Sequence, residues 1–201
     1  TYIKYLPELG AAINPAKFLK PSWLITSIDT AELLSSPSFP SLQWLSERSL
    51  DWFAGKSSIS GAQPFAQKYT GHQFGHYNPQ LGDGRGVLLG EVESSHGRFD
   101  IHVKGAGQTP YSRFGDGRAV VRSSIREFLA SEALHHIGIP TSRALGVFTT
   151  GEQVQRETIE QGAALIRVCP SHIRFGHFEN AFHHGDTDLQ TRLVEYCINH
   201  V

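Results

Sequence analysis

Alternating apolar and polar positions predict a β-hairpin near the middle of the chain. Val87–Val92 and Phe99–Lys104 are strand-like and flank Ser94-Ser-His-Gly97, where glycine suits the positive φ of a tight turn. Because side chains alternate along a strand, the polar residues of the second strand share one face. These residues are Asp100, His102 and Lys104. We interpret that face as one wall of a polar site.

A helix is predicted after the hairpin, beginning between Ala119 and Ser124 and ending before Gly138. Glu127 within it has two interpretations. It can face the sheet, or it can form a capping box with Ser124 and satisfy an N–H group at the start of the helix. The pattern leaves both open.

Further strands and one more helix are predicted downstream. Three segments are strand-like, with Thr150-Gly-Glu152 as a hairpin turn between the first two: Arg143–Thr149, Gln153–Ile159 and Ala163–Val168. After Pro170 the chain is expected to be irregular and aromatic, up to the helical pattern of Thr187–His200.

Prolines punctuate residues 1–60, which contain two helix-sized windows. The first is Ile28–Leu34, with Asp29 or Thr30 as its cap, and the second is Leu42–Phe53. We expect residues 1–60 to be an N-terminal extension packed on the core, with no chemistry of its own.

Composition excludes several classes of protein. The chain has 201 residues with 39% hydrophobic and 18% charged residues, which is typical of globular proteins. A formal net charge of −1 argues against a general nucleic-acid binder, and no run of 18 apolar residues predicts a membrane span. Cys169 and Cys197 lack a metal or redox spacing and fit a reducing compartment, although one disulfide stays open.

Glycines and basic residues gather in one region. Eleven of the chain's 20 glycines lie between Gly71 and Gly117. The interval from Lys104 to Arg126 contains a single acid, Asp116, and five basic residues: Lys104, Arg113, Arg118, Arg122 and Arg126. Bare loop amides beside clustered cations predict a site for a polyphosphate.

Two histidine pairs are candidate metal ligands. His72 and His76 have the i,i+4 spacing of ligands on a helix, but the nearby glycines disfavour a helix. His183 and His184 lie near Asp186, and adjacent histidines rarely point at one ion. We favour structural roles for both pairs and predict no metal ligand in this chain.

The order of elements resembles the N-terminal lobe of a protein kinase. A Gly-rich loop precedes a strand that ends in Lys104, and a helix carrying Glu127 follows. In kinases such a lysine neutralises nucleotide phosphates and the glutamate holds the lysine. The glycine pattern Gly82-x-Gly84-x-Gly86 is one residue shorter than the kinase pattern.

Five longer motifs resemble a more specific family, selenoprotein O (SelO, bacterial YdiU). They are Tyr69-Thr-Gly-His-Gln-Phe-Gly75, Pro79-Gln-Leu-Gly-Asp-Gly-Arg85, Leu88-Leu-Gly-Glu91, His102-Val-Lys-Gly-Ala-Gly-Gln-Thr-Pro-Tyr-Ser-Arg113 and Asp116-Gly-Arg-Ala-Val-Val-Arg-Ser-Ser-Ile-Arg-Glu-Phe128. The match is strong over residues 69–180 and weak before residue 60.

The resemblance implies an α+β, protein-kinase-like fold that binds ATP in a flipped orientation and transfers AMP to Ser, Thr or Tyr hydroxyls of proteins. It also implies that Glu127 pairs with Lys104. The implied nucleotide contacts are Gly82, Gly84, Arg85, Lys104, Asp116, Gly117, Arg167 and Arg174. Arginines and a lysine can stabilise the charge of a departing pyrophosphate.

The resemblance further implies three parts: an extension (1–60), a kinase-like N-lobe (61–170) and the start of a helical second lobe (171–201). The family's catalytic Asp and its Mg²⁺ (or Mn²⁺) ligands are expected beyond Val201, so we expect a fragment that does not turn over. An isolated lobe would expose apolar surface and self-associate.

Two other functions stay open on sequence grounds. The chain could be a non-catalytic nucleotide- or anion-binding module, or an interaction protein that uses the aromatic Phe175–Phe182 segment. The resemblance implies a cytoplasmic location for a bacterial member and a mitochondrial one for a eukaryotic member, with no membrane or nucleic-acid partner.

Overall fold

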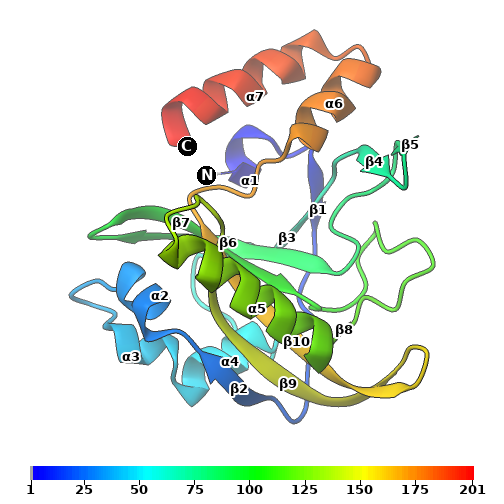
Figure 1. The fold of residues 1–201 in the computed structure, drawn as a ribbon. Helices are drawn as coiled ribbons and strands as arrows, with labels where there is room; N and C mark the ends of the chain where they lie inside the picture. The colour runs from blue at the N-terminus through cyan, green and yellow to red at the C-terminus, as the bar shows by residue number, and fades with distance from the viewer. Residues whose placement is uncertain (1) are drawn as a thin grey trace.

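In a computed structural model, which describes residues 2–201, the chain is built on one large antiparallel sheet (Figure 1). The sheet has eight strands in the order β1-β3-β6-β7-β10-β9-β2, and β8 pairs with β10. Its strands are β1 (Gly10–Ala12), β2 (Ser22–Thr26), β3 (Phe65–Gln67), β6 (Gly86–Ser94), β7 (Gly97–Lys104), β8 (Ala119–Val120), β9 (Arg143–Gln155) and β10 (Ile159–Cys169). A separate hairpin pairs β4 (Gly71–Gln73) with β5 (His76–Asn78).

The predicted central hairpin is confirmed. β6 and β7 pair antiparallel from Gly86 opposite Lys104 to Ser94 opposite Gly97, and Gly97 has a φ of 123°. Strand β10 pairs with the other edge of β7, with Arg167 opposite His102. Lys104 of β7 and Arg167 of β10 therefore lie on neighbouring strands.

The N-terminal segment is part of this sheet and covers one of its faces. β2 pairs with β9 and β1 with β3, so residues 1–60 contribute two strands. Four short helices belong to the same segment: α1 (Tyr2–Tyr5), α2 (Ile28–Leu33), α3 (Ser41–Trp44) and α4 (Glu47–Phe53). Apolar residues from α2 to α4, among them Leu34, Leu50 and Phe53, join Ile101 and Ile166 of the sheet in the largest apolar core.

The predicted helix after the hairpin is confirmed as α5 (Val121–His136), which crosses the opposite face of the sheet (Figure 1). Phe128 of α5 packs with Val147 of β9 and Leu165 of β10. The N-cap residue of α5 is Val120, without a side-chain cap, so Ser124 and Glu127 do not form a capping box.

The predicted hairpin turn at Thr150-Gly-Glu152 is wrong, because β9 continues through it to Gln155. Thr149 pairs with Ala163 and Gln153 with Gln161, so four steps along β9 match two along β10. The extra residues form a bulge in which Gly151 has a φ of 77°. The chain instead turns after Gln155.

Two expectations for the N-terminal helices also need correction. The window Leu42–Phe53 contains two helices, since α3 ends at Trp44 and Ser46 caps α4 through the amide of Ser49. The cap of α2 is Ser27, whose hydroxyl accepts a hydrogen bond from the Thr30 amide, and not Asp29 or Thr30.

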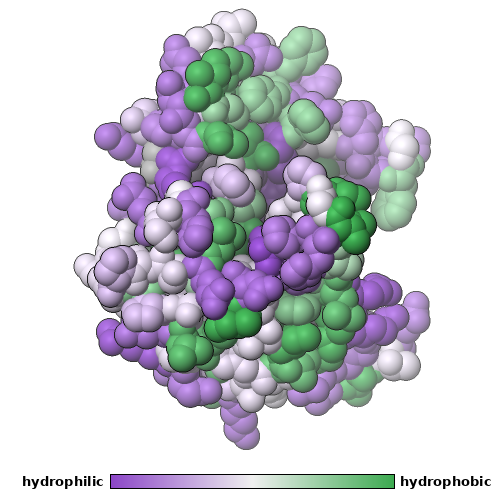
Figure 2. Space-filling view, turned by 60° about the vertical axis from the view of Figure 1, so that its left-hand side comes forward, coloured by the Kyte–Doolittle hydropathy of each residue, from purple (hydrophilic) through white to green (hydrophobic). Residues whose placement is uncertain are grey.

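The segment after Pro170 is mostly helical, contrary to the irregular structure expected there. It contains α6 (Phe175–His183), and the predicted last helix is confirmed as α7 (Thr187–His200). Both helices pack with α1, so α1 and α7 lie side by side (Figure 1). Hydrophobic residues gather over the C-terminal helices (Figure 2), where Phe175 is 90% and Ile198 77% exposed.

The fold class is therefore α+β with a mainly antiparallel sheet, as predicted. None of the helices found within residues 2–201 combines the length and apolarity needed to cross a membrane.

We predict that Glu132→Ala lowers the free energy of unfolding by about 3 kcal/mol, because it leaves a nearly buried arginine without a carboxylate partner. Glu132 of α5 bonds Arg143 through two hydrogen bonds of 2.7 and 2.9 Å and accepts the Ala144 amide. The Arg143 side chain is only 9% exposed. Urea denaturation measures the change.

Glu160→Ala is the matched control for Glu132→Ala. Glu160 also holds an arginine, Arg122, but that side chain is 64% exposed. We expect no measurable destabilisation from Glu160→Ala. Equal losses in the two variants would show that burial does not set the contribution of the Glu132 pair.

Candidate functional site

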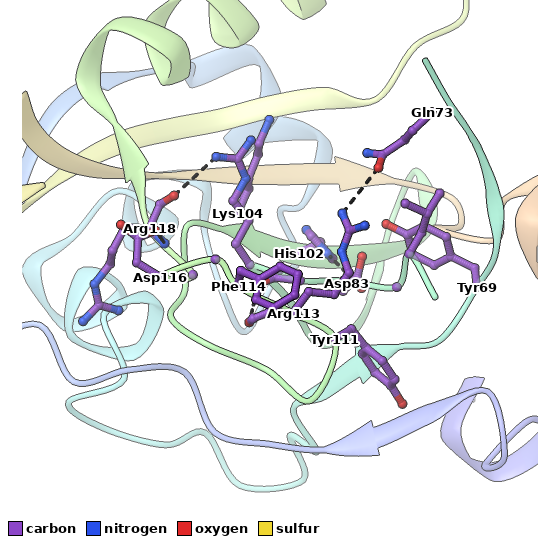
Figure 3. Close-up of a pocket in the computed structure, with 18 of the residues that line it drawn as sticks. Tyr69, Gln73, Asp83, His102, Lys104, Tyr111, Arg113, Phe114, Asp116 and Arg118 are labelled. Carbon is purple, nitrogen blue, oxygen red and sulfur yellow. Dashed lines mark hydrogen bonds and ion pairs between the residues drawn. The ribbon is translucent and has the colours of Figure 1, made fainter. Parts of the chain in front are cut away.

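A cavity of about 670 Å³ opens where the ends of β7 and β10 meet two loops (Figure 3). The first loop is Gly82–Gly86 and the second runs from Tyr111 to Arg118. Seven basic side chains line the cavity: Arg85, Lys104, Arg113, Arg118, Arg156, Arg167 and Arg174. Two acidic residues line it, Asp83 and Asp116. The site therefore carries an excess of positive charge suited to an anion.

Glycine is required in the first loop because the second loop lies directly on it. Gly82 has a φ of 59°, and a β-carbon there would lie 2.5 Å from the ring of Tyr111. A β-carbon on Gly84 would lie 2.9 Å from the Tyr111 carbonyl oxygen. The Ser112 hydroxyl donates a 2.6 Å hydrogen bond to the Gly84 carbonyl. The two loops consequently form one wall.

Glu127 holds two cations side by side at this wall. Its carboxylate pairs with Lys104 through one oxygen and with Arg167 through the other, where the Nε donor lies 2.6 Å away. Burial alone would raise the pKa of Glu127, but Arg167 and Lys104 outweigh burial and lower it. Burial lowers the pKa of Lys104, against the opposing effect of Glu127.

A buried carboxylate of the first loop contacts a buried histidine of β7. Asp83 is 4% and His102 1% exposed, and the His102 Nε2 atom lies 3.3 Å from the Asp83 carboxylate. Arg174, just before α6, lies 3.4 Å from the other oxygen of Asp83, and its guanidinium stacks over Tyr69 at 4.5 Å. Asp83 thus links the first loop, β7 and Arg174.

Three contacts close the rim of the cavity. Arg156, in the turn between β9 and β10, pairs with Asp116 at 2.7 Å. Arg118 pairs with Glu152 at 2.8 Å. Arg113 donates to Gln73 of the β4–β5 hairpin at 3.3 Å (Figure 3). The rim therefore combines the second loop, the β9–β10 turn and the small hairpin.

All eight sequence-derived candidates face this one cavity: Gly82, Gly84, Arg85, Lys104, Asp116, Gly117, Arg167 and Arg174. Glu127 stands behind Lys104 and Arg167. Sequence analysis missed Asp83, Tyr69 and Arg156. The position of Asp83 between two glycines was a usable signal, but Arg156 had none because its place depends on where the β9–β10 turn falls.

Three of the four candidate histidines make side-chain contacts within the fold. His72 lies 3.8 Å from Glu179, and the ring of His183 lies 4.4 Å from that of Tyr77. His184 contacts the Asn180 carbonyl at 2.7 Å, and His76 is exposed at the start of β5. Throughout the described part of the chain, no three His, Cys, Asp or Glu residues form a group able to hold a metal ion.

Glycine-rich loops and an excess of cations around a polar cavity on an α+β scaffold are features suited to a polyanion. The chain matches the family described as protein adenylyltransferase SelO over residues 13–201. It belongs to that family.

Similar proteins carry the name protein nucleotidyltransferase YdiU. The relative from Pseudoalteromonas atlantica is 50% identical over 202 residues, covering 100% of this chain and 41% of that protein. The relative from Erwinia tasmaniensis is 60% identical over 149 residues, covering 74% of this chain and 31% of that protein. The chain thus spans about two fifths of the Pseudoalteromonas relative.

We predict that acid weakens the fold partly through Glu127. A carboxylate whose pKa is lowered by folding stabilises the protein above its unfolded pKa, and this contribution is lost as the pH falls through the folded value. For Glu127 that loss begins below the ordinary value of 4.5.

Glu127→Gln removes the protonation of residue 127. The free energy of unfolding of this variant should therefore fall less than that of the wild type as the pH drops. Urea denaturation at about pH 6 and about pH 3.5 measures both losses, and their difference isolates Glu127 from the other acids. Identical losses would contradict the stabilising role of the Glu127 pairs.

Proposed function

We propose that residues 2–201 form the ATP-binding part of a protein adenylyltransferase. The observation that carries this proposal is the Lys104–Glu127–Arg167 cluster beside the Gly82–Gly86 loop. A lysine fixed by a helix glutamate, next to a close-packed glycine loop, is the arrangement that kinase-like proteins use for nucleotide phosphates. The family description supports the same activity.

In this proposal the strands of residues 61–170, α5 and the Gly-rich loops form a kinase-like N-lobe, to whose sheet residues 1–60 add the edge strands β1 and β2. Residues 1–60 are its extension, and α6 and α7 begin a second lobe. The antiparallel sheet with α5 packed on it supports this assignment.

The cations of the cavity suit the chemistry of AMP transfer. A hydroxyl oxygen of a protein Ser, Thr or Tyr attacks the α-phosphorus of ATP, and the bond from that phosphorus to the pyrophosphate oxygen breaks. Negative charge grows on the pyrophosphate as it leaves. In this proposal Lys104, Arg167 and Arg174 stabilise that charge, and Arg85 supports the phosphates.

The hydroxyl proton and the metal require other groups. Asp83 pairs with His102 and Arg174, and Asp116 with Arg156, so the two acids of the cavity are already engaged. Residues 2–201 therefore do not fit a Mg²⁺ site. We propose that the catalytic Asp and the Mg²⁺ ligands lie in the part of the relatives that this chain does not cover.

We predict that the 201-residue chain binds ATP weakly, with a Kd of about 100 μM or above, because each exposed charge contact contributes little. Binding should weaken at high salt, since salt screens exposed charges. Added Mg²⁺ should not tighten it, and no labelled AMP should reach protein. Calorimetry at low and high salt, with a transfer assay, tests this. Robust transfer would place the catalytic carboxylate within these residues.

Lys104→Ala should weaken ATP binding by about tenfold or more while leaving the melting temperature nearly unchanged, because a partly exposed site lysine supports phosphates and not the core. Lys56→Ala is the control: Lys56 also pairs with an acid, Asp51, but does not line the cavity. Calorimetry and thermal unfolding of both variants give the comparison. Equal ATP affinity in the two variants would remove Lys104 from the proposed site.

A further inference from the structure

Asp83 is an unexpected residue in a site for an anion. Its carboxylate is almost fully buried, lines the cavity, and accepts a 3.2 Å hydrogen bond from the Gln67 amide. A negative charge at this place repels a polyphosphate. Because the Asp83 carboxylate is buried at this place nevertheless, the residues that contact it indicate its role.

Arg174 is the cation that compensates Asp83. Burial lowers the pKa of His102 to about 3, despite the opposing effect of Asp83, so His102 is neutral near pH 7. Within residues 2–201 the buried His102 Nδ1 atom has no hydrogen-bond partner, which fits a neutral ring that donates from Nε2 to Asp83. Burial alone would raise the pKa of Asp83, but His102 first, then Arg174 and the hydrogen bond from the Gln67 backbone amide, hold it well below its ordinary value.

The Arg174 side chain is fixed by four contacts below the cavity wall. Its Nη2 atom lies 3.4 Å from Asp83, and its Nη1 atom donates to Gln67 Oε1 at 2.8 Å and to the His172 carbonyl at 3.2 Å. Tyr69 stacks on the guanidinium. The side chain is still 30% exposed and lines the cavity, so part of the fork remains available to a ligand.

We propose that Asp83 is a positioning residue that, together with Gln67, holds the Arg174 guanidinium in the orientation that binds ATP phosphate. This inference rests on the proposed function. Asp83 acts through Arg174 and does not itself bind the nucleotide. An arginine already fixed in place loses less conformational freedom when the ligand arrives, so anchoring strengthens binding.

The sign of one substitution separates positioning from simple electrostatics. Asp83→Asn keeps the shape of the side chain and removes its charge. If Asp83 acted on the ligand only by repulsion, Asp83→Asn would tighten ATP binding. Positioning predicts the opposite, a loss of about tenfold, the usual size of one charge-assisted contact.

A double-mutant cycle supplies the decisive measurement. ATP affinity of the 201-residue chain is measured by calorimetry for wild type, Asp83→Asn, Arg174→Ala and the double variant. We expect Asp83→Asn to weaken binding only when Arg174 is present, and to leave affinity equal or tighter in the Arg174→Ala background. A loss of the same factor in both backgrounds, or tightening in the wild-type background, overturns the inference.

Arg156 provides the control cycle. It lines the same cavity but pairs with Asp116. Asp83→Asn and Arg156→Ala should therefore act additively on ATP affinity. Coupling as large as that with Arg174 would show that Asp83 shapes the whole cavity and not one arginine, against the proposal.

Gln67→Leu is the second variant should Asp83→Asn fail to fold. It removes the closest acceptor of Arg174 without changing charge, and the same Arg174-dependent loss of ATP affinity is expected. Loss that persists in the Arg174→Ala background overturns the anchor. If the wild type does not bind ATP at all, the proposed function and this inference are both overturned. If the wild type binds ATP but the substitutions act additively with Arg174→Ala on ATP affinity, the inference alone is overturned.

Discussion

Repulsion among like charges is the constraint on which this structure depends, because seven basic side chains converge on one cavity. Most are held by a carboxylate that lines the cavity or lies behind it. Glu127 holds Lys104 and Arg167, and Asp83 faces Arg174. Asp116 and Glu152 pair with two further arginines at the rim. The acids make a concentration of cations compatible with a stable fold.

These acids come from elements distant in sequence, so the cavity depends on the whole sheet. Glu127 is on α5, while its partners end β7 and lie in β10. The pairing of β7 with β10 sets the distance between Lys104 and Arg167. Phe128 packs α5 against β9 and β10 and thereby places Glu127 beside both cations. The N-terminal segment covers the other face of those strands. The ion pairs and the hydrophobic core therefore stabilise the same arrangement of Glu127, Lys104 and Arg167.

Local signals were sufficient for part of this architecture. The β6–β7 hairpin and α5 followed from alternation, from a turn glycine and from a helix stop, which are all encoded within about 20 residues. The turn at Gly151 was wrong because glycine serves a bulge as well as a turn, and only the register against β10 distinguishes them. Helix α6 was missed because its first turn begins with Phe175-Gly-His, a weak helix former. Its place depends on the contact between Gly176 and Thr70.

The candidate site was predictable to the extent that its residues lie in motifs. Lys104 and the glycine loop could be located from sequence, whereas the choice between the two interpretations of Glu127 required the position of α5 on the sheet. The sequence did not identify Asp83 and Arg156 as site residues, because their partners lie far away along the chain. Arg174 is 91 residues from Asp83, and Asp116 is 40 residues from Arg156 (174 − 83 and 156 − 116).

The packing of α1 against α7 has a consequence for how the chain is made. Arg192 pairs with Glu8 across 184 residues, and Tyr2 stacks edge-on against Tyr196. At a ribosomal rate of about 5–20 residues per second, α1 waits roughly 10–40 s for its partner to be synthesised. During that interval the cluster of Tyr2, Leu6 and Leu9 lacks its partners from α7, and this is the period in which a chaperone would have an apolar surface to bind.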